Sequence, residues 1–299
     1  MEKLFQELIE LGKTKKFNGE IDYGANITSE SLSEVQKLVG TSEETKEIIE
    51  KHLEDASHIH YTLLAMVISN HLLDQATPRE PKPVIPFEEF EEETDTSPQI
   101  LKACRSMRLL VNLIMRSPEF ASRISSDVVE LLETIVVAKW SSLETLCILT
   151  KTAAAGAHLE FQKSPRYSHL LEGILKFSKF DLFARGPLMG FLISYFSILL
   201  EKDYAFVASA YADMSSESLV ELLDFVRVIL EKNAKDSGDS EGQKLKIHSN
   251  NLLFVLNLLE LMTVDYSAFL RARAEREPNT VQEKLNATVE MLYMLVESV

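Results

Sequence analysis

The chain contains 299 residues, of which 45% are hydrophobic, and it carries a formal net charge of −15. Such a composition can bury a sizeable core, while the acidity disfavours nucleic acid and anionic membrane surfaces, because both attract basic proteins. The longest apolar run, residues 187–200, is too short to span a bilayer, so membrane insertion is not expected. The N-terminal residues do not resemble a signal peptide, and the two cysteines suggest no disulfide framework, which favours a cytoplasmic location.

The first quarter of the chain shows short amphipathic patterns. Residues 3–11 place their apolar side chains on one face of a helix. Ser29 is expected to cap a second helix and Ser42 to begin a third. A longer apolar segment, Tyr61 to Leu73, predicts a buried helix after them.

Residues 77–98 interrupt this helical pattern. They contain five prolines, and six of the eight residues from Glu88 to Asp95 are acidic. Prolines break helices, and a run of like charges favours solvent. We therefore expect an exposed acidic loop that projects from the helical part.

From Ile100 onward the pattern is helical almost throughout. The expected helices are 100–115, 128–136, 143–159, 167–177, 188–200, 215–230, 252–262, 269–277 and 281–299. No strand pattern competes with them, so the sequence predicts an all-α protein.

Four aromatic residues recur behind four of the apolar segments. They are Phe120, Phe161, Tyr204 and Tyr266, and their spacings are 41, 43 and 62 residues. The first two spacings match the period of armadillo and HEAT repeats, roughly 40–47 residues. The third is longer by about one loop, and residues 233–243 have a loop composition. We therefore predict an armadillo/HEAT-like right-handed superhelical solenoid that spans residues 1–299 as a single repeat domain, the rival being a compact helical bundle of two domains.

No recognised catalytic or cofactor motif occurs in the sequence. His58 and His60 are two residues apart, which places them on different faces of a helix. Cys104 and Cys147 are 43 residues apart, one repeat, and are expected in equivalent buried positions. We therefore predict no catalytic residue, no metal site and no cofactor.

Polar side chains occur inside three of the apolar helices. Asn112 and Asn257 lie midway along two of them, and Ser197 takes the corresponding place in a third. Armadillo arrays often use such asparagines to bind the backbone of an extended peptide, which makes these three residues the candidate partner-binding positions. The alternative is an amide that bonds a neighbouring buried carbonyl, as buried amides generally do.

Three stretches resemble the ataxin-10 family. These are residues 103–124, with the motif ACRSMRLLVNLIMRSPEFASRI, residues 190–226 and residues 251–270. The family's C-terminal armadillo segment has no counterpart before Val299, so the chain is either a divergent, shortened member or a fragment. The resemblance implies a cytoplasmic armadillo-type protein without catalysis, associated with protein binding, self-association, neuronal survival and cell division.

The expected function is therefore a non-enzymatic scaffold whose partners are other proteins. One alternative is an armadillo-type nucleotide-exchange factor for a chaperone or a G-protein α subunit, which accelerated nucleotide release would reveal. A hydrolase or transferase without a recognised motif is a further alternative. A deep pocket with two carboxylates of strongly shifted pKa would favour it.

Overall fold

The computed structural model divides into two compact units, residues 1–167 and 168–299. It describes residues 1–14, 17–19, 23–41, 44–77, 97–138, 140, 142–167, 169–171, 173–174, 194–195, 198–199 and 201–202. Most of these belong to the first unit. The single repeat domain predicted for the whole chain stays a prediction.

All regular elements of the described residues are helical, which confirms the all-α class. They are α1 (Glu2–Thr14), α2 (Ser29–Thr41), α3 (Glu44–Lys51), the 3₁₀ turn η1 (Leu53–Asp55), α4 (Ala56–Ala76), α5 (Pro98–Arg116), α6 (Pro118–Ser122), α7 (Asp127–Val137), α8 (Ser142–Ala154) and α9 (His158–Gln162). None of these helices is both long enough and apolar enough to cross a membrane.

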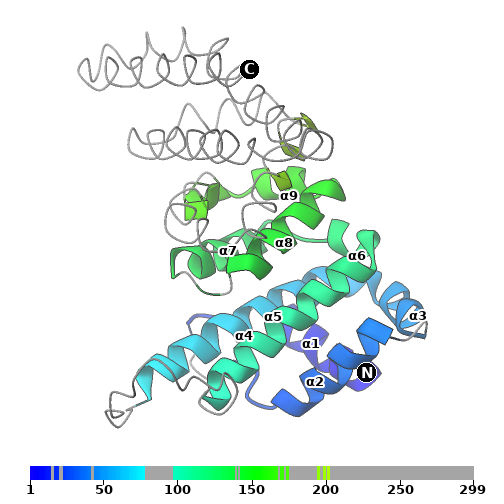
Figure 1. Cartoon of the computed structure of the whole chain (residues 1–299), viewed down its shortest axis with the longest axis vertical. Helices are drawn as coiled ribbons and strands as arrows, with labels where there is room; N and C mark the ends of the chain where they lie inside the picture. Colours follow the sequence, from blue (N-terminus) through cyan, green and yellow to red (C-terminus); the bar gives the residue numbers. More distant parts are fainter. Residues whose placement is uncertain are drawn as a thin grey trace, which may run out of the picture. The chain divides into compact units, whose positions relative to one another are not determined.

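The long helices of the first unit pack as consecutive pairs. α4 packs along α5, and each contacts the matching helix of the pair before and the pair after (Figure 1). Thus α4 lies against α1 and α7, while α5 lies against α2 and α8. Every residue from Ile59 to Asn70 in α4 is buried, because neighbours surround that helix.

Side-chain hydroxyls cap three of the helices. Ser97 Oγ accepts the amide of Ile100 at the start of α5, and Ser117 Oγ accepts the amide of Phe120 in α6. At α2 the cap is Thr28, whose Oγ1 accepts the amide of Ser31. The expectation that Ser29 caps this helix is therefore wrong by one residue, because Ser29 already lies in the helix and its hydroxyl accepts from Arg105.

The helix expected over residues 143–159 is broken into α8 and α9. Gly156 adopts a φ of +88°, which L-residues with a side chain rarely adopt. The amide of Ala157 donates to Thr152 O and that of Gly156 to Ala153 O, the two bonds of a Schellman motif. The apolar pattern continues through this break, so periodicity alone missed it.

The recurring aromatics that lie in the described residues occupy equivalent local structures. Phe120 lies in α6 behind α5, and Phe161 lies in α9 behind α8. Both short helices have five residues, and both rings are fully buried. The repeat in the sequence therefore corresponds to a repeat in structure for its first two members.

Several expected features fall outside the described residues. The acidic loop predicted over residues 77–98 lies between the end of α4 at Ala76 and the start of α5 at Pro98. Residues 78–96 are not described. The aromatics Tyr204 and Tyr266 and the helices expected after residue 202 also lie outside them.

Helices α1 and α4 approach each other closely at Gly12. A Cβ atom built on Gly12 would lie 2.4 Å from the carbonyl oxygen of His58 and 2.7 Å from its Cβ. We expect Gly12→Ala to lower the free energy of unfolding by about 1–3 kcal/mol, because overpacking outweighs the gain in helix propensity. Urea denaturation measures the loss, with Gln6→Ala on the exposed face of α1 as a control within about 0.5 kcal/mol of the original chain. An unchanged midpoint for Gly12→Ala would contradict this packing.

Candidate functional site

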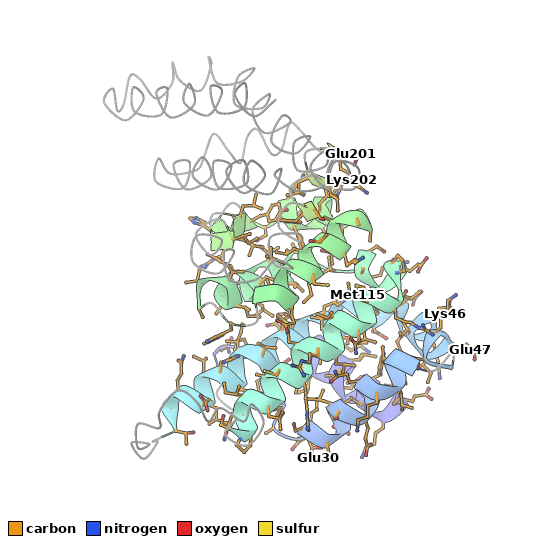
Figure 2. All side chains as sticks on the ribbon, viewed as in Figure 1. Glu30, Lys46, Glu47, Met115, Glu201 and Lys202 are labelled. Atoms are coloured by element: carbon orange, nitrogen blue, oxygen red, sulfur yellow. The ribbon has the colours of Figure 1, made fainter. Side chains whose placement is uncertain are left out.

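Among the described residues, one face of α5 stays uncovered although the helix packs against α2, α4 and α8. Leu101, Arg105, Arg108, Asn112 and Met115 follow one another at intervals of four, three, four and three residues, which aligns them along the helix. We call this set the α5 stripe. Leu101 is 37% exposed and Met115 53% exposed, and Figure 2 labels Met115 near the C-terminal end of α5. The stripe therefore has an exposed apolar residue at each end.

The opposite face of α5 is buried in the first unit. Its buried side chains are Ala103, Ser106, Met107, Leu109, Leu110, Leu113 and Ile114. Their spacing follows the helical period, so the same pattern that fixes α5 to its neighbours turns the stripe outward.

The charge of α5 is opposite to that of the chain. The helix contains Lys102, Arg105, Arg108 and Arg116 and no acidic residue, whereas the chain carries a net charge of −15. Arg105 Nη1 donates to Ser29 Oγ at 2.9 Å. Neither Arg105 nor Arg108 forms an ion pair with a described carboxylate, whereas Arg166 pairs with Glu133 at 3.2 Å. Within the described residues neither guanidinium group is occupied by a carboxylate, so both can bind an external anion, Arg105 through the donors that Ser29 leaves unused.

Asn112 is the one predicted partner-binding residue that the structure describes. It lies on the α5 stripe, is partly exposed, and its amide has no hydrogen-bond partner among the described residues. A groove residue must have an amide that reaches solvent, and Asn112 meets this condition. Ser197 and Asn257 lie outside the described residues, so whether they share a face with Asn112 stays a prediction.

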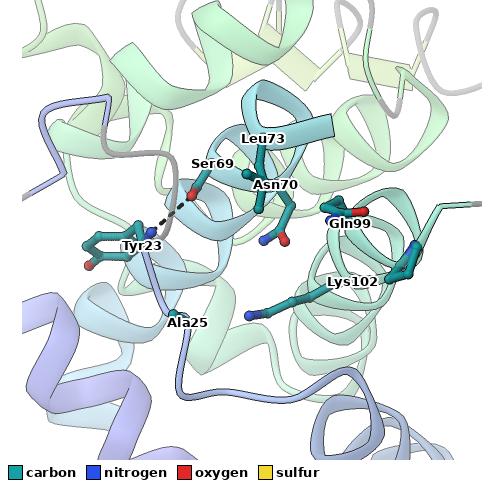
Figure 3. A pocket seen from close by; sticks show the side chains of 8 residues that line it. Tyr23, Ala25, Ser69, Asn70, Leu73, Gln99 and Lys102 are labelled. Carbon is teal, nitrogen blue, oxygen red and sulfur yellow. Dashed lines mark hydrogen bonds between the residues drawn. The ribbon is translucent and has the colours of Figure 1, made fainter. Parts of the chain in front are cut away.

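A small cavity opens at the start of α5. It has a volume of about 250 Å³ and is lined by Tyr23, Ala25, Ser69, Asn70, Leu73, Pro98, Gln99 and Lys102 (Figure 3). This volume lies below the usual range of ligand pockets, about 300–1,000 Å³.

Ser69 and Lys102 of this cavity hold the loop before α2. Tyr23 N donates to Ser69 Oγ at 3.0 Å, and Lys102 Nζ donates to Gly24 O at 2.9 Å. Asn70 Nδ2 donates to Met66 O at 2.8 Å within α4. Burial lowers the pKa of Lys102. These hydrogen bonds hold the loop before α2 against α4 and α5. We therefore assign the residues that line the cavity a structural role.

The cysteines do not form a reactive site. Burial is the main cause that raises the pKa of both the Cys104 and the Cys147 thiol, which disfavours the nucleophilic thiolate. Cys147 is buried, which confirms the prediction for this residue. Its Sγ lies 3.9 Å from Met115 Sδ. Cys104 is only partly buried, because it borders the exposed face of α5, so the expectation of two equivalent buried positions is wrong for this residue.

His60 and His71 each pack against an aromatic ring. His60 is fully buried against Phe120, with ring centroids 4.4 Å apart, and neither ring nitrogen has a hydrogen-bond partner. His71 instead stacks on Trp140 at 4.4 Å. In the described ranges no three metal-ligating side chains come together.

Comparisons with protein-family models, with curated proteins and with solved structures find no match for this chain. The resemblance of residues 103–124, 190–226 and 251–270 to the ataxin-10 family therefore stays a prediction.

Proposed function

We propose that this chain is a non-enzymatic armadillo-type scaffold that binds other proteins along the α5 stripe. The observation that carries the proposal is the packing of the first unit. Three consecutive helix pairs, α1 with α2, α4 with α5 and α7 with α8, lie one against the next, and the exposed Leu101 and Met115 mark a face of α5 that no described helix covers. Stacked helix pairs are the building plan of armadillo and HEAT arrays, which commonly present an extended binding surface.

The repeated local structure supports the same proposal. α5 with α6 and α8 with α9 each consist of a long helix and a five-residue helix with a buried phenylalanine. Continuation of this unit through the rest of the chain would build the predicted right-handed solenoid. The proposal includes the ataxin-10-like roles in cell division and neuronal survival, self-association and a cytoplasmic location.

Asn112 provides a direct test of the binding face. Its amide has no described partner, so we expect Asn112→Ala to change the free energy of unfolding by no more than about 0.5 kcal/mol. Loss of a hydrogen bond to a bound protein should weaken binding by about 1 kcal/mol, or roughly fivefold. The measurement is capture of proteins from a cytosolic extract, identified by mass spectrometry and then titrated one by one against the purified chain.

Gln6→Ala is the matched control for this experiment. It removes an exposed amide from α1, which lies in the other layer of helix pairs. Partners of the α5 stripe should bind this variant as they bind the original chain. Equal affinity of every captured protein for the Asn112→Ala variant would exclude Asn112 from the binding face. Capture of no protein at all would contradict the scaffold.

A further inference from the structure

The α5 stripe has a length and a chemistry that define a kind of partner. Leu101 and Met115 are 14 residues apart, a distance of about 21 Å along a helix at 1.5 Å per residue. An extended peptide covers this length with about six residues. Arg105 and Arg108 lie between the apolar ends, about one turn apart, so their guanidinium groups can serve neighbouring anionic groups.

The two arginines favour carboxylates as their ligands. A guanidinium group presents a planar set of donors that matches the two oxygens of a carboxylate. Arg108 is exposed, and no ion pair joins it to a carboxylate of the described residues. An incoming acidic side chain therefore does not have to displace a salt bridge within the part of the chain that the structure describes.

The rest of the surface makes the position selective. With 46 acidic and 31 basic residues, most of the chain repels an acidic peptide. Screening limits this repulsion to about 8 Å at physiological salt, so the local charge of α5 decides where the peptide binds. An acidic segment is thus directed to the stripe and away from other faces.

Nucleic acid fits this surface less well than an acidic peptide. The stripe has two arginines and no aromatic side chain, whereas single-stranded nucleic acid is bound by longer basic grooves with aromatic residues for base stacking. The exposed Leu101 and Met115 instead offer apolar contacts that amino-acid side chains can use.

We infer that the α5 stripe binds an extended acidic segment of a partner protein, about six residues long, with carboxylates on Arg105 and Arg108 and apolar side chains on Leu101 and Met115. This inference rests on the proposed scaffold function and adds the chemistry of the partner.

A display library of short random peptides, selected on the purified full chain, tests the inference. The selected peptides should carry at least two carboxylates between apolar residues. Their dissociation constants, measured by fluorescence polarisation, should rise at least about tenfold in the Arg105→Glu/Arg108→Glu variant, because attraction becomes repulsion. They should also rise with salt concentration.

The matched control is Lys3→Glu/Lys46→Glu, which changes the net charge by the same amount. Both lysines are exposed on helices other than α5, where they pair with Glu7 and Glu50, and Figure 2 labels Lys46 on α3. This variant should bind the selected peptides within about threefold of the original chain. Arg105→Gln/Arg108→Gln, which removes the two positive charges without introducing negative ones, serves as a second variant if the charge reversal lowers the melting temperature.

The outcomes separate the inference from the function on which it rests. Selection of neutral or basic peptides, or an equal loss of affinity in the lysine control, would overturn the acidic partner and leave the scaffold standing. Binding of polyuridine RNA or of phosphatidylserine vesicles that the arginine variant abolishes, without any selected peptide, would overturn it in favour of another class of ligand. Failure of both the library and the extract to yield any partner would overturn the scaffold itself.

Discussion

Phe120→Ala should lower the free energy of unfolding of the first unit by about 3–5 kcal/mol, because it removes a fully buried ring from a packed core. The ring lies in α6, which contacts α5 and α8, and it meets the imidazole of His60 edge to face at 70°. A cavity left at this position would have α4, α5 and α8 around it, three helices that cannot all move inward without losing other contacts.

The fluorescence of Trp140 reports this unfolding without interference from other tryptophans. It is the single tryptophan of the chain, and its ring stacks on His71 of α4. Phe161→Ala should give a loss of similar size, since Phe161 occupies the equivalent buried position in α9. Leu159→Ala, in the same short helix but 54% exposed, should cost less than about 1 kcal/mol. Equal denaturation midpoints for Phe120→Ala and Leu159→Ala would show that the recurring aromatics do not hold the helix pairs together.

Acid should destabilise the first unit because of His60. Burial lowers the pKa of this imidazole from 6.5 to about 3. The folded protein therefore keeps His60 neutral at pH values where the unfolded chain takes up a proton. The stability is complete above pH 6.5 and falls by about 1.4 kcal/mol per pH unit as the pH decreases from 6.5 towards 3. At pH 5 the expected loss from this residue is roughly 2 kcal/mol.

His60→Leu isolates this contribution. The leucine cannot take up a proton, so the variant should lose less stability than the original chain between pH 7.5 and pH 5, by about 2 kcal/mol. At pH 7.5 it should be equal or higher in stability, because both nitrogens of His60 are buried without hydrogen-bond partners. His71 adds pH dependence in the same direction, since burial is the main cause that lowers its pKa.

The control for His60→Leu is an exposed histidine. His169→Leu makes the same substitution at an exposed position and should change the free energy of unfolding at pH 7.5 by no more than about 0.5 kcal/mol. Urea denaturation at a series of pH values, followed through Trp140, measures all three proteins. Parallel curves of stability against pH for the His60→Leu variant and the original chain would mean that His60 finds solvent or a hydrogen-bond partner in the folded protein.

Only part of the candidate site was predicted from the sequence. Asn112 was predicted because a single amide interrupts an apolar helix. Arg105 and Arg108 were not predicted, although the sequence of α5 contains no acidic residue while the whole chain is acidic. Charge counted over each expected helix, rather than over the whole chain, would have singled them out. The exposure of Leu101 and Met115 could not be read in this way, since both look like core residues in an apolar segment.

The sequence by itself determined the helices and where several of them begin. A period of 3.6 residues is a local property, so α5 and α7 appear within two residues of their true bounds, whereas the apolar segment Tyr61 to Leu73 marks only the middle of α4. The start of α5 was placed two residues too late, at Ile100, because Pro98 was assigned to the loop; in the structure Ser97 caps the helix and the proline is its first residue.

Only the tertiary structure decided which faces are covered and which side chains lose their solvent. Nothing local distinguishes the fully buried His60 from a surface histidine, since its burial depends on Phe120, sixty residues further along the chain. Thr28 caps α2, while the hydroxyl of Ser29 accepts from Arg105, which lies 76 residues further along the chain. The α5 stripe is exposed because α2, α4 and α8 cover the other faces of the helix. Contacts between helices far apart in sequence are set by packing, which periodicity does not encode.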